Sequence, residues 1–81
     1  MKATVLVRPK AGILDPQGEA VQTSLRHLGY EVGDARVGRL IDLEGDEQDA
    51  ARARERVDAM CRQLLTNPLI ESYEIELQER T

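Results

Sequence analysis

The chain has 81 residues and a net charge of −4, which predicts one small domain over residues 1–81 and argues against nucleic acid, whose binding needs a basic face. Cys61 is the only cysteine, so a disulfide framework and a cysteine-based zinc site are excluded. No apolar run reaches the roughly 18 residues of a membrane span, and the chain opens on a strand pattern rather than a signal peptide, so we expect a cytoplasmic protein that does not bind membranes.

The hydrophobic core must be built from Val, Leu, Ile, Ala and Met. Phe and Trp are absent, and Tyr30 and Tyr73 are the only aromatic residues. A domain of this size buries only about 60–65% of the surface that its unfolded chain exposes. We therefore expect association with other chains to supply part of its stability.

Residues 2–8 predict the first strand, because apolar side chains recur at every second position. The positions that share one face are Ala3, Val5 and Val7. Pro9 cannot donate a ladder hydrogen bond and therefore ends the strand or sits at its edge. Residues 10–14 then form a short connection.

The stretch Leu14-Asp15-Pro16-Gln17-Gly18 predicts the start of a helix. Asp15 can accept a hydrogen bond from a free N–H at the helix N-terminus, and Pro16 suits the first helical position. We expect this helix over residues 16–28, with one narrow apolar stripe formed by Val21, Leu25 and Leu28. Gly29 then supplies a residue that can take positive φ, as commonly happens just after a helix.

Residues 30–43 are long for one strand and contain Gly38 near the middle. A glycine within a strand weakens it and often marks a bulge or a bend. Two interpretations stay open, namely one long bent strand or a short hairpin that turns at Gly38-Arg39. The bent strand is favoured, because the apolar positions keep one parity on both sides of Gly38: Ala35, Val37, Ile41 and Leu43.

Residues 47–66 predict the second helix, and Asn67-Pro68 stops it. Its buried stripe is marked by Ala50, Ala53, Val57, Met60, Cys61, Leu64 and Leu65. Residues 69–77 predict the last strand, because apolar and acidic side chains alternate there. The side chains on its apolar face are Tyr73, Ile75 and Leu77.

The order of elements is therefore strand, helix, long strand, helix, strand. This order predicts an α+β two-layer sandwich of ferredoxin-like character, in which two helices cover one face of a small, mostly antiparallel sheet. The opposite face is polar apart from Leu6 and Leu40. We predict that these two leucines lie in a contact between subunits of an oligomer.

The residues show no arrangement typical of catalysis. His27 and Cys61 would need a third group to orient them, and the sequence offers none. The glycines form neither a phosphate-binding loop nor a dinucleotide fingerprint. We therefore predict no catalytic, cofactor-binding or metal-binding residue in this chain. Arg36 and Arg39 either grip a carboxylate of a partner chain or protect a strand edge from aggregation, and both interpretations stay open.

A family resemblance is carried by segments spread along the chain. They are Leu14-Asp15-Pro16-Gln17-Gly18, Ala20-Val21-Gln22, Leu25, Leu28-Gly29-Tyr30, Val37-Gly38-Arg39, Met60-Cys61, Leu64-Leu65, Asn67-Pro68 and Ile70-Glu71-Ser72-Tyr73. From Lys2 to about Leu77, the sequence resembles PurS, the small accessory subunit of phosphoribosylformylglycinamidine synthase.

The resemblance implies a role in de novo purine biosynthesis. The complete enzyme of this family is an ATP-dependent carbon–nitrogen ligase that converts formylglycinamide ribonucleotide, glutamine and ATP into formylglycinamidine ribonucleotide, glutamate, ADP and phosphate. A large synthetase subunit uses ATP and Mg²⁺, and a glutaminase subunit releases ammonia. The resemblance implies that the small subunit binds no cofactor, forms a homodimer or homotetramer, and assembles the other two subunits.

We expect this chain to act as a scaffold that holds two working enzymes in position for ammonia transfer. The connection after the first strand and the region around Gly38 are predicted to face the partner subunits. The residues concerned are Lys10, Gly12, Leu14, Arg36, Gly38 and Arg39. The alternative is a dimeric regulatory module of ferredoxin-like type that binds a small metabolite, because the fold alone does not separate these functions.

Overall fold

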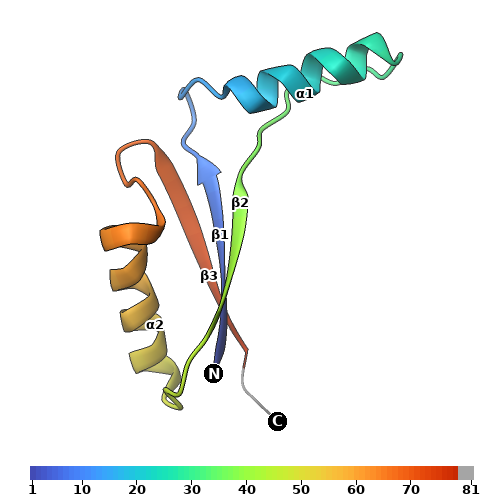
Figure 1. Cartoon of the computed structure of the whole chain (residues 1–81). Helices are drawn as coiled ribbons and strands as arrows, with labels where there is room; N and C mark the ends of the chain where they lie inside the picture. The colour runs from blue at the N-terminus through green and yellow to red at the C-terminus, as the bar shows by residue number, and fades with distance from the viewer. Residues whose placement is uncertain (79–81) are drawn as a thin grey trace.

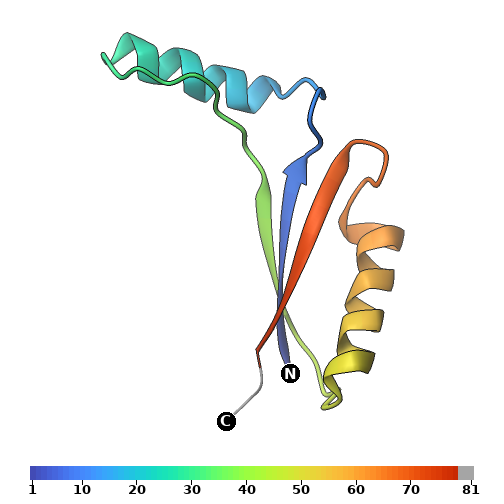
Figure 2. The ribbon, with the colours of Figure 1, turned by 180° about the vertical axis from the view of Figure 1, so that it is seen from behind.

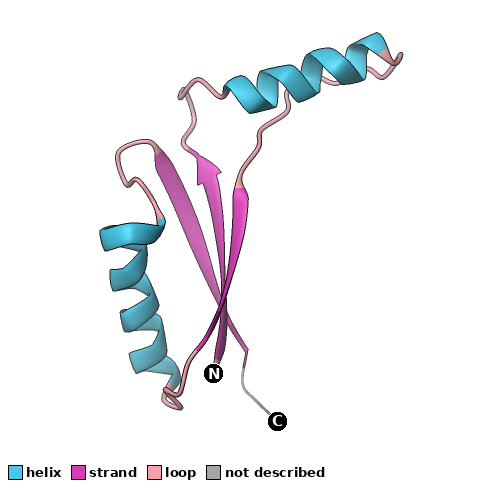
Figure 3. Cartoon of the chain, viewed as in Figure 1, coloured by secondary structure: helices cyan, strands magenta, loops and turns pink. Residues whose placement is uncertain are grey.

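The computed structural model describes residues 1–78 of the chain (Figure 1). In chain order, the elements are β1 (Lys2–Pro9), α1 (Pro16–His27), β2 (Arg39–Glu44), α2 (Ala50–Met60), the π-helical turn η1 (Cys61–Leu65) and β3 (Glu71–Gln78). Figure 3 shows the strands, helices and loops by colour. This succession of elements confirms the α+β class predicted from the sequence.

The strands form one antiparallel sheet in the order β2-β1-β3, with β1 at the centre. Val5 of β1 lies opposite Ile41 of β2 and Ile75 of β3. Because side chains alternate along a strand, this register places the apolar positions of all three strands on one face. Strands β2 and β3 are the two edges of the sheet within the described chain.

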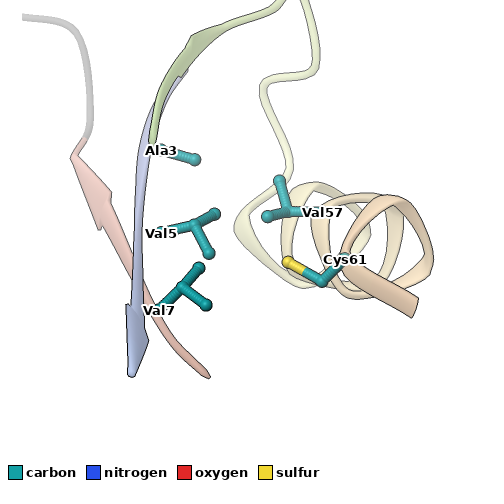
Figure 4. Close-up of a cluster of buried hydrophobic side chains, with 5 residues drawn as sticks. All are labelled: Ala3, Val5, Val7, Val57 and Cys61. Carbon is teal, nitrogen blue, oxygen red and sulfur yellow. The ribbon is translucent and has the colours of Figure 1, made fainter. Parts of the chain in front are cut away.

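The hydrophobic core lies between this face and α2 (Figure 4). Ala3, Val5 and Val7 point from β1 toward Val57 and Cys61 on the helical side, and all five are buried. A fully buried valine contributes about 1.5–3 kcal/mol through the hydrophobic effect. Partly buried side chains pack around this cluster: Ile41, Leu43, Leu65, Tyr73, Ile75 and Leu77. The core is therefore small and mainly aliphatic, as the composition predicted.

The second predicted helix, residues 47–66, is α2 followed by η1. Asp49 accepts a hydrogen bond from the N–H of Ala51 (3.0 Å), so the helix begins after this capping residue rather than earlier. The last turn is wider than an α-helical turn, because the N–H and the hydroxyl of Thr66 both donate to the carbonyl oxygen of Cys61 (3.0 and 2.8 Å). Thr66 thus closes the turn and satisfies its own buried hydroxyl in the same contact.

Helix α1 does not pack on the sheet, so the predicted placement of both helices on one face is wrong. Helix α2 covers the sheet, whereas α1 leaves its upper end and points away from it (Figures 1 and 2). The apolar stripe of α1 is correspondingly open, with 42% of Val21 and 74% of Leu28 exposed. The periodicity identified an apolar face correctly, but within residues 1–78 this protomer leaves Val21 and Leu28 of that face exposed.

The segment that returns from α1 to the sheet explains this placement. Residues 29–38 run back alongside α1 (Figure 2). The side chain of Gln22 donates a hydrogen bond to the carbonyl oxygen of Gly33 (3.2 Å), and that of Arg26 donates to the carbonyl oxygen of Val32 (3.1 Å). The helix and the first part of this segment form one projecting unit, residues 16–34, which we call the arm. The arm makes the chain elongated, with a radius of gyration of 16.0 Å, against about 12 Å for a compact chain of this length.

Strand β2 is shorter than the predicted strand of residues 30–43, and Gly38 marks neither a bend within it nor a hairpin turn. The residues between α1 and Arg39 pair with no strand in the described structure. An ideal Cβ at Gly38 would lie 2.1 Å from the carbonyl oxygen of Val7. Glycine is therefore required at Gly38, because the returning segment meets β1 too closely for any side chain.

We expect Gly38→Ala to lower the free energy of unfolding by about 1–2 kcal/mol, because the added methyl group would press on rigid backbone. Gly33→Ala is the matched control, since nothing lies within 4 Å of the Cβ that it adds. Its effect should stay within about 0.5 kcal/mol. Urea unfolding at one fixed protein concentration measures both variants. Equal stability of Gly38→Ala and Gly33→Ala would contradict the close approach.

Candidate functional site

The two residues that the sequence offered for catalysis lie on different parts of the molecule. His27 ends α1 on the arm, whereas Cys61 is fully buried in the core. Burial, followed by the charge of Asp58, raises the pKa of the Cys61 thiol and so disfavours the reactive thiolate. Within residues 1–78, no group of three or more His, Cys, Asp or Glu side chains is placed to hold a metal ion. Nor is any helix of this part long and apolar enough to cross a membrane.

The residues predicted to face partner subunits are brought together at the upper end of the sheet, where the arm is attached. Lys10, Gly12 and Leu14 lie in the connection that leads to the arm, and all three are exposed. Gly12 has a φ of +84°, which favours glycine and fixes the turn of this connection. The contact of these residues with a partner chain stays a prediction.

Arg36 holds this connection from the returning segment. Its Nη2 donates hydrogen bonds to the carbonyl oxygens of Lys10 (2.9 Å) and Ile13 (3.3 Å). The N–H of Lys10 in turn donates to the carbonyl oxygen of Ile70, just before β3 (2.9 Å). The guanidinium that the sequence offered to a partner carboxylate is therefore engaged within its own chain.

Asp15 makes the complementary connection. One carboxylate oxygen accepts from the N–H of Gly18 (3.1 Å), which is the predicted helix cap. The other oxygen accepts from the N–H of Val37 on the returning segment (2.7 Å). The Val37 bond, followed by the Gly18 bond, holds the pKa of Asp15 below its usual value of 3.8. The carboxylate therefore stays ionised at neutral pH and joins the two ends of the arm.

Arg39 reaches from β2 to Glu71 at the start of β3. Its Nη1 and Nη2 donate to the two carboxylate oxygens, and Nη2 also donates to the carbonyl oxygen of Leu65. Glu71 additionally accepts from the N–H of Asn67 (2.8 Å). The Arg39 bond, followed by the Asn67 bond, holds the pKa of Glu71 below its usual value of 4.5. This cluster fastens the end of η1 to both edge strands.

The ion pair of Arg39 and Glu71 predicts an acid-sensitive fold. The pKa of Glu71 is lower in the folded state than in the unfolded state. The contribution of this carboxylate to the stability of the fold is therefore complete above about pH 5 and is lost as the pH falls through the folded-state pKa. We expect Glu71→Gln to lower the free energy of unfolding at neutral pH and to flatten its decline on acidification. Urea unfolding across this pH range measures the effect.

Glu55→Gln is the control for this experiment, since Glu55 is an exposed glutamate on α2. It should reproduce the wild-type dependence of stability on pH. If Glu71→Gln and the wild type lost stability in parallel on acidification, the ion pair would not be the cause of the acid sensitivity.

The face of the sheet opposite α2 carries the predicted subunit contact. Leu6 and Leu40 lie opposite each other in the register of β1 and β2, and 57% of Leu40 is exposed. Around them, polar side chains pair across neighbouring strands: Thr4 with Asp42, Arg8 with Glu74, and Lys2 with Glu44. Because exposed ion pairs contribute little, the leucines are the residues on this face that gain most from being covered. Their role in oligomerisation stays a prediction.

The sequence did not reveal how much apolar surface the fold leaves open. Besides Leu40 on β2 and Met60 on α2, exposed large apolar side chains lie on or beside the arm and around the turn before β3: Leu14, Val21, Leu28, Tyr30, Leu64, Leu69 and Ile70. Periodicity had assigned four of these exposed residues to apolar stripes that we expected to be covered, namely Val21, Leu28, Met60 and Leu64. It identifies an apolar face but not what covers that face. So many open apolar side chains on one small chain are typical of a protein that associates with others.

The fold and these surfaces define a class of protein, namely a small α+β subunit whose apolar arm is available to other chains. Residues 2–79 match the family described as PurS: Phosphoribosylformylglycinamidine (FGAM) synthase. The chain therefore belongs to the PurS family, as the resemblance predicted.

Curated relatives are similar along nearly the whole chain. The phosphoribosylformylglycinamidine synthase subunit PurS of Methanocaldococcus jannaschii is 35% identical over 79 residues, which cover 96% of this chain and 95% of that protein. The corresponding subunit of Synechocystis is 45% identical over 74 residues, covering 90% of this chain and 72% of that protein. This chain is accordingly a subunit of phosphoribosylformylglycinamidine synthase, an enzyme of purine biosynthesis.

Solved structures share the fold, including the arm. The crystal structure of PurS from Methanocaldococcus jannaschii matches with a TM-score of 0.87 at 36% identity, over 99% of this chain and 98% of that one. A chain in the structure of PurLQS from Thermotoga maritima matches with a TM-score of 0.84 at 34% identity, over 93% of each chain. Since these matches extend over nearly all residues, the projecting arm is a feature of the shared fold.

Proposed function

We propose that this chain is a non-catalytic assembly subunit, which holds the glutaminase and synthetase subunits of phosphoribosylformylglycinamidine synthase together for ammonia transfer. The observation that carries the proposal is its likeness to a chain of the PurLQS structure from Thermotoga maritima, over 93% of its length. A chain of this fold therefore occurs in an assembly that is named PurLQS. The open apolar side chains of the arm supply surface for such an assembly.

The chain is proposed to act as a homodimer or homotetramer in which the arm of one protomer packs on the sheet of another. Helix α1 has 12 residues, and an isolated helix of about 12–15 residues is marginal in water, so packing must stabilise it. Its own sheet does not provide that packing. A second copy offers two apolar side chains that stay partly open on the face of its sheet that bears the core: Ile41 and Leu43. A homotetramer would join two such dimers.

The scaffold acts by geometry rather than by chemistry of its own. Ammonia that leaves one active site reaches the next only if the docked subunits keep it from diffusing into solvent and from being protonated. In this proposal the synthetase subunit uses ATP and Mg²⁺, and the chain itself binds no cofactor. The cytoplasmic location expected from the sequence stays a prediction.

Reconstitution of the enzyme tests the assembly function. Purified synthetase and glutaminase subunits are assayed with and without this chain, first with glutamine and then with ammonium as the nitrogen donor. We expect the chain to be required for glutamine-dependent turnover and for a stable three-component complex in analytical ultracentrifugation, while ammonium-dependent turnover is unaffected. Full glutamine-dependent turnover in its absence would contradict the proposal.

The regulatory alternative is tested on the isolated chain. A ligand that binds the folded state raises the unfolding temperature according to its affinity and concentration. A scaffold should show no such shift with amino acids or nucleotides. A reproducible, concentration-dependent shift would favour the metabolite-binding module instead.

A further inference from the structure

The arm is joined to the sheet by two short stretches of chain, which run beside each other at its base. We call these stretches the root: residues 10–15 lead out, and residues 35–38 lead back. Because α1 makes few contacts with the sheet (Figure 1), the direction of the arm depends on what holds the root together. Two unlinked stretches of irregular backbone would allow the arm to pivot.

Asp15 fixes the root from the outgoing stretch. A helix cap needs only one acceptor oxygen, and Oδ1 fills that role toward the N–H of Gly18 (3.1 Å). The second oxygen, Oδ2, accepts from the N–H of Val37 (2.7 Å), which lies 22 residues further along the chain. One rigid carboxylate thus ties the start of α1 to the returning stretch.

Arg36 fixes the root from the returning stretch. Its Nη2 donates to the carbonyl oxygens of Lys10 and Ile13 (2.9 and 3.3 Å), and both belong to the outgoing stretch. The two side chains therefore act reciprocally, since each stretch supplies one side chain that binds the backbone of the other. The outgoing stretch is itself anchored to the sheet, because the N–H of Lys10 donates to the carbonyl oxygen of Ile70 (2.9 Å).

Close packing supports these hydrogen bonds. Gly18 is the buried residue of α1, and an ideal Cβ there would lie 2.2 Å from the carbonyl oxygen of Ala35 and 2.5 Å from the Asp15 carboxylate. The first turn of the helix therefore rests directly on the returning backbone. Contacts this close leave the two stretches little freedom to slide past each other.

We propose that Asp15 and Arg36 are positioning residues, whose reciprocal clamp on the root sets the direction in which the arm leaves the sheet and so sets the spacing of the subunits in the assembled enzyme. The clamp follows from the contacts of this chain, whereas its effect on the enzyme rests on the assembly function proposed above. The direction of the arm matters in that setting because it determines where the surfaces of the arm meet another chain.

Spin labels measure the direction of the arm without partner subunits. Cysteines for labelling replace Thr23 on α1 and Gln63 in η1, both exposed, while the buried Cys61 stays unlabelled. Labelled protein is diluted into an excess of unlabelled protein, so that pulsed-EPR distances arise within one chain. We expect one narrow distance distribution for the otherwise wild-type chain.

Asp15→Asn keeps an oxygen that can cap the helix but turns an N–H toward the N–H of Val37. Arg36→Gln removes the double contact with the outgoing carbonyls. Both variants should broaden or shift the distance distribution while circular dichroism shows a folded chain. Asp34→Asn is the matched control on the same arm, because Asp34 is exposed and its side chain makes no hydrogen bond or ion pair within residues 1–78.

The same variants are then assayed in the reconstituted enzyme. We expect glutamine-dependent turnover to fall several-fold for Asp15→Asn and Arg36→Gln, with ammonium-dependent turnover and the Asp34→Asn control unchanged. Distance distributions that match the wild type in both variants would overturn the clamp. Altered distances with unchanged glutamine-dependent turnover would overturn the positioning role. If the wild-type chain itself supported no glutamine-dependent turnover, the proposed assembly function would be contradicted. The distance distributions would still test the clamp independently.

Discussion

Val21→Lys combined with Leu28→Lys is expected to convert the proposed homodimer into a monomer. Both side chains are open in the single protomer, and a symmetric dimer would bury each of them twice. Covering large aliphatic side chains contributes up to about 1.5–3 kcal/mol each, so we expect the four lysines to cost the dimer about 4 kcal/mol of association free energy. Such a loss weakens the dimer about a thousandfold. Lysine is chosen because it favours helix as well as leucine does.

Sedimentation over a wide concentration range measures this dissociation. Thr23→Lys is the control, since it places a lysine on an exposed polar position of α1 without removing an apolar side chain. The control should retain the wild-type association. A double variant that associates as tightly as the wild type would show that the arm lies outside the dimer contact, and the oligomer would then have to form through another surface, such as the face with Leu6 and Leu40.

Gly18→Ala is expected to lower the free energy of unfolding by about 2–3 kcal/mol, because the added methyl group meets both backbone and carboxylate. The structure places that methyl group 2.2 Å from the Ala35 carbonyl oxygen and 2.5 Å from Asp15 Oδ2. Helix propensity alone predicts the opposite sign, a gain of roughly 1 kcal/mol, since alanine favours a helix more than glycine does. The sign of the change therefore separates packing at the root from propensity.

Urea unfolding of Gly18→Ala beside Thr23→Ala provides the comparison. Thr23 is exposed on the same helix, so its replacement should change stability only by the small difference in propensity. A stabilised Gly18→Ala protein would mean that the first turn of α1 is not held against the returning segment. The root would then need another source of rigidity.

Several elements could be predicted from local sequence because their cause is local. Strand β1 begins at the predicted residue and extends one residue further, since the recurrence of Ala3, Val5 and Val7 at every second position matches the period of a strand. The start of α1 was predicted to the residue, because Asp15 and Pro16 both favour that backbone geometry. The order of the elements and the α+β class follow from such local signals.

The position of the arm could not be predicted, because it depends on contacts between distant residues. An apolar stripe on α1 requires a covering surface, and the simplest prediction was the sheet of the same chain. The structure instead ties the returning segment to α1 and leaves Val21 and Leu28 of the stripe exposed. Sequence periodicity is the same in both cases, since it contains no information on which chain provides the cover.

Arg36 and Arg39 show the same limit within the candidate site. Their position beside Gly38 suggested an open, partner-facing bend, but the acceptors that they bind lie 23 to 32 residues away in the sequence. Alanine at either position would therefore remove an internal contact as well as any contact with a partner. The glutamine-dependent assay of such variants is informative only beside a measurement of their stability.

The projecting arm also has a kinetic consequence. On the proposed homodimer, α1 acquires its packing only when a second protomer arrives, so the final step of folding is an encounter between two molecules. Refolding should then contain a phase whose rate rises with protein concentration, in addition to a concentration-independent phase for the sheet and α2. A cell would have to synthesise enough of this subunit at once, since a lone protomer exposes its unfinished helix to proteases and to aggregation for as long as it waits.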